Sequence, residues 1–354
     1  MHIPFCRAKC GYCDFYSLVG DDATKTAYTA EVCRRLSGLR GRTADTLYVG
    51  GGTPSQLGGS RIARIIEAAR PLLTADAEIT VEANPCDDMA AFLPAVAAAG
   101  VNRLSLGMQS AVDKELALLT RRHNFEQVAN AVATARAAGI NNISLDLMIG
   151  IEGQTPQSLC YSIDRCAELG ADHISAYMLK LEEGTPFHSR GAGCFASADE
   201  AADLYLLACE RLSSHGYLQY EISNFCRGGR HSRHNLKYWL GQPYIGIGPA
   251  AHSCDGGRRY YYERDLSAFL AGAQPVDDGP GGGEEEYIML RLRLTDGIDL
   301  DELAAQFGAA SAERVSRRAE PLARAGLIKC DGRHLALTPR GMLVSNSIIG
   351  RFID

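Results

Sequence analysis

The chain has 354 residues, of which 46% are hydrophobic and 22% are charged, and its formal net charge is −6. This composition is typical of an ordinary globular protein, and the length allows one large domain with a smaller one. The negative charge argues against a general nucleic-acid or anionic-membrane surface. No apolar run approaches the roughly 18–20 residues that a membrane span needs, and no signal peptide is expected. Nine of the twelve cysteines are scattered singly, so we predict a reducing, cytoplasmic location.

Three further cysteines, Cys6, Cys10 and Cys13, form a C-x-x-x-C-x-x-C pattern near the start of the chain. A four-iron cluster is normally held by four thiolates. Here Phe15 stands where a further cysteine could follow, so a cluster would keep one open iron, able to chelate the amino and carboxylate groups of a small molecule. A disulfide pair, structural zinc with His2 as the fourth ligand, and buried hydrophobic cysteines remain alternatives at this point.

Strand and helix patterns then alternate. We expect helices at residues 21–40, 60–73, 89–99, 125–138 and 156–169, and strands at 46–49, 78–81, 102–106, 143–149 and 173–177. A strand should also precede Cys6, which makes six. Glycine follows three of the helices, at Gly100, Gly139 and Gly170, as expected for helix ends. This alternation predicts a parallel α/β sheet, either an incomplete barrel or a doubly wound sheet.

Polar residues follow the carboxyl ends of these predicted strands, where ligands gather in either fold. They are the segment Gly50-Gly51-Gly52-Thr53, Glu82, Gln109 and Asp146. The cysteine spacing resembles that of the radical S-adenosylmethionine (SAM) superfamily, and these residues suit such a ligand. Gly50, Gly51 and Gly52 would allow the backbone to approach the ammonium group, and Glu82 and Asp146 would accept hydrogen bonds from the ammonium and the ribose hydroxyls. Arg121 would pair with the carboxylate. Taken singly, the glycines also fit a tight turn and each charged residue a structural role.

Longer motifs make the resemblance more specific. They are His2-Ile-Pro-Phe-Cys, Gly50-Gly-Gly-Thr-Pro-Ser, Glu82-Ala-Asn-Pro, Arg103-Leu-Ser-Leu-Gly-Met-Gln-Ser and Asp146-Leu-Met-Ile-Gly. The chain resembles the oxygen-independent coproporphyrinogen III oxidase group, and within it the HemW branch of heme chaperones. The resemblance implies that Cys6, Cys10 and Cys13 hold a 4Fe-4S cluster. It also implies that Gly52, Thr53, Glu82, Gln109, Arg121 and Asp146 match SAM-contacting positions of the oxidase.

A second motif, His234-Asn235-Leu-Lys-Tyr238-Trp239, resembles the H-N-x-x-Y-W motif that this branch relates to heme binding. The resemblance implies heme contact by His234, Asn235, Tyr238 and Trp239, with His234 as a candidate axial ligand and the aromatic rings against the porphyrin. His231 and Cys226 are alternative ligands. Without the resemblance, a structural histidine beside a half-buried tryptophan is the simpler interpretation.

Residues 245–253 are expected to form a strand with close backbone approach, in which Ala250 replaces a glycine usual in the family. We expect a loop at 191–194 and a linker at 275–283, rich in Gly, Pro and Asp. We therefore predict three domains: a partial (β/α)6 TIM-type radical SAM barrel (1–190), an α/β extension (191–275) and a small winged-helix-like module (284–354). The module lacks a clear basic stripe, so docking of a protein or a lid role is favoured over DNA binding.

The predicted function is that of a heme chaperone that binds a 4Fe-4S cluster, SAM and heme and passes heme to apo-hemoproteins. The alternative is a coproporphyrinogen III oxidase, which Phe15 and the lack of the oxidase's N-terminal extension disfavour. A regulatory or scaffold protein is a third hypothesis, against which the cysteine motif counts. Whether SAM is cleaved and whether the chain forms a homodimer are left open.

Overall fold

A computed structural model describes residues 1–191 and 194–353. Its main sheet has eight strands in the order β1-β2-β3-β4-β5-β6-β8-β7, and the first six are parallel. Because consecutive strands are neighbours throughout β1–β6, the sheet has no point at which strand order reverses, as a doubly wound sheet would. The two edge strands, β1 and β7, do not pair with each other in the described sheet. The incomplete-barrel prediction is therefore confirmed.

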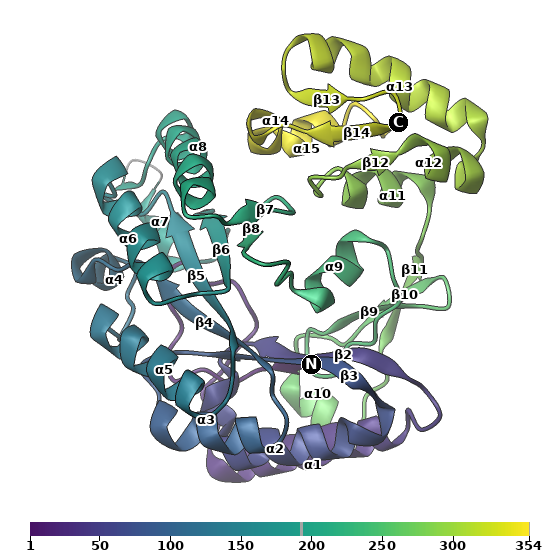
Figure 1. Ribbon diagram of the computed structural model, residues 1–354. Helices are drawn as coiled ribbons and strands as arrows, with labels where there is room; N and C mark the ends of the chain where they lie inside the picture. Colours follow the sequence, from purple (N-terminus) through teal and green to yellow (C-terminus); the bar gives the residue numbers. More distant parts are fainter. Residues whose placement is uncertain (192–193, 354) are drawn as a thin grey trace.

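The helices lie on the outside of this curved sheet (Figure 1). The strands are β1 His2–Ile3, β2 Ala44–Gly51, β3 Leu73–Ala83, β4 Arg103–Gln109, β5 Asn142–Ile149, β6 His173–Met178, β7 Leu218–Gln219 and β8 Asn224–Cys226. The helices that accompany them are α1 Asp22–Ser37, α2 Gly59–Ala69, α3 Met89–Ala98, α4 Asp113–Leu118, α5 Phe125–Ala137, α6 Pro156–Glu168, α7 Pro186–Arg190 and α8 Ala198–Ser214, with short 3-10 turns at Pro54–Leu57 and Arg70–Leu72.

The two faces of the sheet differ in chemistry because side chains alternate along each strand. Val81, Leu104 and Leu145 are fully buried in the hydrophobic core that the outer helices cover. On each strand, the residues on either side of these core residues face the hollow of the barrel and are polar. One row of partners across β3, β4 and β5 consists of Thr80, Arg103 and Asn142. The apolar face explains how the barrel folds, and the polar face is available for a ligand.

The extension follows β8. It contains α9 Arg233–Trp239, β9 His252–Asp255, β10 Arg258–Tyr261, α10 Leu266–Leu270 and β11 Val276–Pro280, and the three strands form an antiparallel sheet. The strand predicted at 245–253 is wrong over most of its length, since regular structure begins only at His252. Its expected close approach is confirmed: a Cβ on Gly248 (φ +119°) would lie 2.3 Å from the carbonyl oxygen of His2. Part of the predicted linker 275–283 is also ordered as β11.

The C-terminal module contains α11 Glu284–Arg291, β12 Ile298–Asp299, α12 Leu300–Phe307, α13 Ala309–Arg324, β13 Ile328–Cys330, β14 His334–Leu337, α14 Pro339–Leu343 and α15 Ser345–Ile349. Its sheet has the order β12-β14-β13, which confirms the predicted wing and adds a strand. The bounds of the three predicted domains remain a prediction, and the loop predicted at 191–194 includes residues 192–193, which lie outside the described residues.

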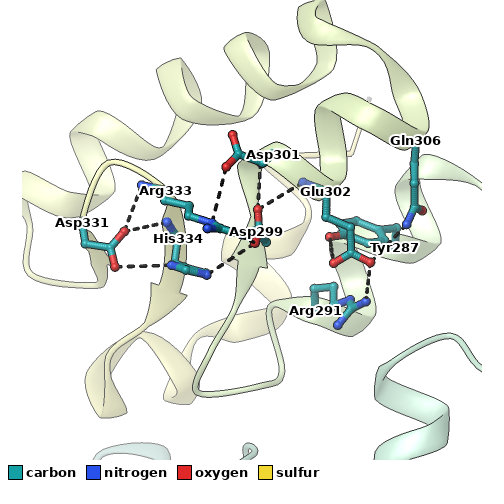
Figure 2. Close-up of polar contacts among 9 residues, drawn as sticks. All are labelled: Tyr287, Arg291, Asp299, Asp301, Glu302, Gln306, Asp331, Arg333 and His334. Atoms are coloured by element: carbon teal, nitrogen blue, oxygen red, sulfur yellow. Dashed lines mark hydrogen bonds and ion pairs between the residues drawn. The ribbon is translucent and has the colours of Figure 1, made fainter.

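Polar contacts fasten the wing to α12 (Figure 2). The carboxylate of Asp299 caps α12 by accepting hydrogen bonds from the amides of Asp301 and Glu302, at 2.9 and 3.1 Å. It also pairs with Arg333 beside β14, at 2.8 Å. The hydrogen bond from Arg333 and those from the amides lower the pKa of Asp299 to about 2. The C-terminal module is thus held by charge pairs as well as by its core.

Candidate functional site

The cysteine loop connects β1 to α1 at the carboxyl end of the barrel. Two backbone hydrogen bonds close its base, from Cys6 N to Leu18 O at 3.0 Å and from Leu18 N to Pro4 O at 2.9 Å. Cys6, Cys10 and Cys13 are free, partly exposed thiols. Within residues 1–191 and 194–353, no three His, Cys, Asp or Glu side chains gather to hold a single metal ion. The disulfide alternative finds no support, because all three cysteines are unpaired thiols. Three thiolates are the protein ligands that a 4Fe-4S cluster with one open iron would need.

The glycine segment Gly50–Thr53 packs directly against this loop. Gly52 N donates to Ile3 O and Thr53 N donates to Phe5 O, each at 2.8 Å. A Cβ on Gly52 would lie 2.9 Å from Phe5 O and 3.1 Å from Cys6 Sγ, so only glycine fits between the two segments. Because the amides of residues 50–53 already donate, the segment can meet a ligand through its carbonyl oxygens. That polarity suits an ammonium group.

Arg121 lies on the other side of the cysteine loop. Its guanidinium donates to Gly107 O at 2.8 Å and lies 3.6 Å from Cys10 Sγ, while its buried Nε has no hydrogen-bond partner among the described residues. The hydroxyl of Thr120 accepts a hydrogen bond from Gly11 N at 2.9 Å, which ties this segment to the loop. Gln109, at the end of β4, has a φ of +67°, an unfavourable conformation that is common at binding sites. An unsatisfied guanidinium nitrogen at this place suits an anionic ligand group.

Two acidic side chains, Glu82 on β3 and Asp146 on β5, face the hollow of the barrel. Glu82 accepts hydrogen bonds from the Tyr48 hydroxyl at 2.6 Å and from Gly51 N at 3.1 Å. Asp146 accepts one from the Ser105 hydroxyl at 3.1 Å. Burial raises the pKa of Glu82, and burial followed by the charge of Glu82 raises the pKa of Asp146 to about 7. These carboxyl groups therefore bind a proton more readily than exposed ones, and a cationic ligand would favour their ionised forms.

Arg103, at the start of β4, was not predicted as a site residue. Its side chain is only 2% exposed, and its Nε has no partner among the described residues. Its positive charge lowers the pKa of both Glu82 and Asp146, although burial outweighs it. The alternation of Arg103-Leu-Ser-Leu could have placed Arg103 and Ser105 on the polar face of the sheet, because the two leucines must face the core.

The H-N-x-x-Y-W motif forms helix α9, which lies between the barrel and the C-terminal module (Figure 1). The carboxylate of Glu78 on β3 accepts hydrogen bonds from the amides of Arg233 and His234, each at 3.1 Å, and so anchors the start of the helix. The amide of Asn235 donates to Ser232 Oγ at 3.3 Å. The motif is therefore mounted on the inner, polar face of the barrel.

Both ring nitrogens of His234 are already hydrogen-bonded. Nδ1 lies 2.8 Å from Thr46 Oγ1 and Nε2 lies 2.8 Å from the Tyr238 hydroxyl. The ring also stacks on Tyr48, with centroids 5.1 Å apart and an interplanar angle of 21°. Burial and nearby positive charges lower the pKa of His234 to about 3, so the ring is neutral. To bind iron, His234 would have to give up one of these two hydrogen bonds.

Trp239 points away from this group. The guanidinium of Arg293 lies 5.6 Å from its ring centroid, and its indole nitrogen is buried without a partner among the described residues. Together with Tyr287 and Phe307 of the C-terminal module, Trp239 lines a hollow of about 220 Å³. The structure thus gathers the predicted cluster and SAM residues at one end of the barrel but divides the heme motif between two surfaces.

Comparison with known proteins gives consistent results. Residues 1–166 match the Radical SAM superfamily, and residues 285–344 match the HemN C-terminal domain. The heme chaperone HemW of Mycobacterium tuberculosis is 38% identical over 99% of this chain and 93% of its own length. HemW of Bacillus subtilis is 33% identical over 100% of this chain and 98% of its own length. The chain belongs to the HemW family.

The fold agrees with a solved structure of the wider group. Coproporphyrinogen III oxidase (HemN) of Escherichia coli, a radical SAM enzyme, aligns with a TM-score of 0.84 over 99% of this chain and 88% of its own. The two sequences are 24% identical, so this likeness establishes the fold alone. Membership of the radical SAM superfamily implies SAM and a 4Fe-4S cluster for the HemW family, and the free thiols beside a glycine-rich acceptor segment fit both groups.

Proposed function

We propose that this protein is a heme chaperone that binds a 4Fe-4S cluster, SAM and heme and passes the heme to apo-hemoproteins. The observation that carries the proposal is the full-length similarity to proteins named heme chaperone HemW. The position of α9 adds support, because the motif helix is fixed to the inner face of the barrel by Glu78. Phe15, which is 61% exposed, occupies the position at which the oxidase has a further cysteine. This difference favours the chaperone over the oxidase.

In this proposal Cys6, Cys10 and Cys13 hold the cluster, and the further contacts come from the seven positions Gly51, Gly52, Thr53, Glu82, Gln109, Arg121 and Asp146. When bound, the cluster supplies an open iron and SAM supplies a sulfonium group. The chain's own contribution is to orient the ligand. Arg121 would pair with the carboxylate, the carbonyl oxygens of the glycine segment would accept from the ammonium, and Glu82 and Asp146 would accept from the ammonium and the ribose hydroxyls.

The proposal also includes the cellular compartment and the binding partners of the protein. All twelve cysteines are free thiols, which supports a reducing compartment such as the cytoplasm. Among the described residues, no helix is both long and apolar enough to cross a membrane. Apo-hemoproteins are the proposed partners, and assembly of the chain into a homodimer stays open.

The test is an anaerobic hemin titration of the cluster-reconstituted protein, followed by absorbance in the Soret region. We expect a saturable change that ends near one heme per chain. Transfer is then measured by mixing the loaded protein with an apo-hemoprotein and following its recovered spectrum. Absence of saturable binding would refute the proposal, and turnover of coproporphyrinogen III with SAM and a reductant would favour the oxidase instead.

A further inference from the structure

A cavity of about 200 Å³ lies beside the junction of β1 and β2. It is lined by residues from both strands, from α9 and from the segment that leads into β9, among them His2, Tyr48, His234, Tyr238, Tyr244 and His252. Three of these residues are histidines. The cavity therefore brings the H-N-x-x-Y-W motif, the glycine segment and residues 244–252 to one place, although they are far apart in the sequence.

The three histidines differ in what their ring nitrogens can do. The Nε2 atom of His2 bonds to Tyr16 O at 2.8 Å, and its ring packs so tightly on Gly51 that a Cβ there would lie 2.6 Å from Nδ1. The two nitrogens of His234 are occupied by Thr46 and Tyr238. His234 therefore cannot offer a nitrogen to a metal ion without breaking a hydrogen bond, and the Nδ1 atom of His2 lies against the backbone of Gly51.

His252 is different in each respect. It is exposed at the first position of β9, and neither of its ring nitrogens forms a hydrogen bond or ion pair with any residue in 1–191 or 194–353. Its ring stacks on Tyr261, with centroids 5.3 Å apart and an interplanar angle of 26°. The stacking holds the ring in place while leaving its nitrogens free, which is the arrangement that an axial iron ligand requires.

We propose that His252 is the axial ligand of the cargo heme, and that His234 and Tyr238 of the H-N-x-x-Y-W motif build the aromatic wall beside it. This inference rests on the proposed function. A lone pair of a His252 ring nitrogen forms the bond to iron, and the water or hydroxide bound to hemin leaves. His234 stays hydrogen-bonded and keeps Tyr238 in place.

The wall is made of aromatic rings in fixed positions. Tyr238 packs edge to face against Tyr244, with centroids 4.6 Å apart and an interplanar angle of 90°. Tyr238 also packs edge to face against His234, at 5.1 Å and 86°. The cavity is smaller than the 300–1,000 Å³ of a typical enclosed ligand pocket, so a porphyrin would enter by one edge and remain largely exposed. Partial exposure suits a cargo that has to be released to another protein.

The test compares hemin titrations of four cluster-reconstituted proteins: the wild type, His252→Ala, His234→Phe and the control His188→Ala. His188 is an exposed histidine on α7 that does not line the cavity. Binding is followed by the Soret band, and ligation by electron paramagnetic resonance of the ferric heme. We expect His252→Ala to bind at least tenfold more weakly and to lose the imidazole-ligated signal, with added imidazole restoring that signal.

The other variants separate the competing explanations. His234→Phe should bind heme more weakly, because it loses the hydrogen bond that holds Tyr238, but should keep the imidazole-ligated signal, because His252 is still present. His188→Ala should behave as the wild type. A wild-type signal and affinity in His252→Ala would overturn the inference, as would loss of imidazole ligation in His234→Phe alone. Failure of the wild type itself to bind heme would instead refute the proposed function. Urea unfolding of each variant checks that the fold is intact.

Discussion

Replacement of Gly52 by alanine should damage both the fold and the cluster. The added Cβ would lie 2.9 Å from Phe5 O, 3.0 Å from Ile3 O and 3.1 Å from Cys6 Sγ. Two of these atoms are backbone oxygens of the segment that carries Cys6, the first of the proposed cluster cysteines, so they cannot yield as the end of a flexible side chain would. Relief requires β1 and the cysteine loop to move away from β2. Overpacking of this kind costs about 1–3 kcal/mol.

The free energy of unfolding is measured in urea on the reduced, cluster-free protein, and iron and sulfide are counted after reconstitution. Gly350→Ala is the matched control, because Gly350 already has helical φ and ψ angles and its nearest contact would be an ordinary 3.4 Å. We expect Gly52→Ala to lose about 1–3 kcal/mol of stability and to hold less iron per chain than the wild type and the control. A Gly52→Ala protein with unchanged stability and full iron content would refute the reasoning.

Two other predictions follow from the pKa of Asp146 and from the conformation of Ala250. Since the pKa of Asp146 is raised to about 7 and cationic SAM favours its ionised form, SAM should bind roughly tenfold more weakly at pH 6 than at pH 8. Calorimetry checks this, and a pH dependence that persists unchanged in Asp146→Asn would contradict it. Ala250 has a φ of +64°, which costs an L-residue roughly 1–2 kcal/mol, whereas glycine loses about 0.4–1 kcal/mol through the unfolded state. Ala250→Gly should therefore stabilise the fold by about 0.5–1 kcal/mol in urea unfolding, and a loss of stability would show that the conformation is not strained.

The barrel could be predicted because its signals are local. Each βα unit carries its own periodicity, and glycines mark three helix ends, with φ values of +101° at Gly100, +92° at Gly139 and +71° at Gly170. The antiparallel pair β7 and β8 gave no such signal, because these strands are only two and three residues long. The pairing of β8 with β6, and of β7 with β8, depends on the rest of the sheet. The strand predicted at 245–251 is wrong because the path of this segment depends on a distant contact. It follows the backbone of His2.

The candidate site was predictable in its membership but not in its contacts. Sequence motifs indicate Glu82 and His234, whereas Tyr48 is only one residue of a buried strand pattern. No local pattern could show that Nδ1 of His234 meets Thr46, which is 188 residues away in the chain. The availability of a ring nitrogen therefore had to come from the structure, and it distinguishes His252 from His234.

Tyr48 also shows that the two predicted binding regions are physically continuous. Its hydroxyl donates to Glu82 in the proposed SAM site, and its ring stacks on His234 of the heme motif. Glu78, four residues before Glu82 on the same strand, anchors the helix that carries His234. One pair of neighbouring strands thus positions side chains for both ligands, and the bound groups would lie against a common wall of the barrel.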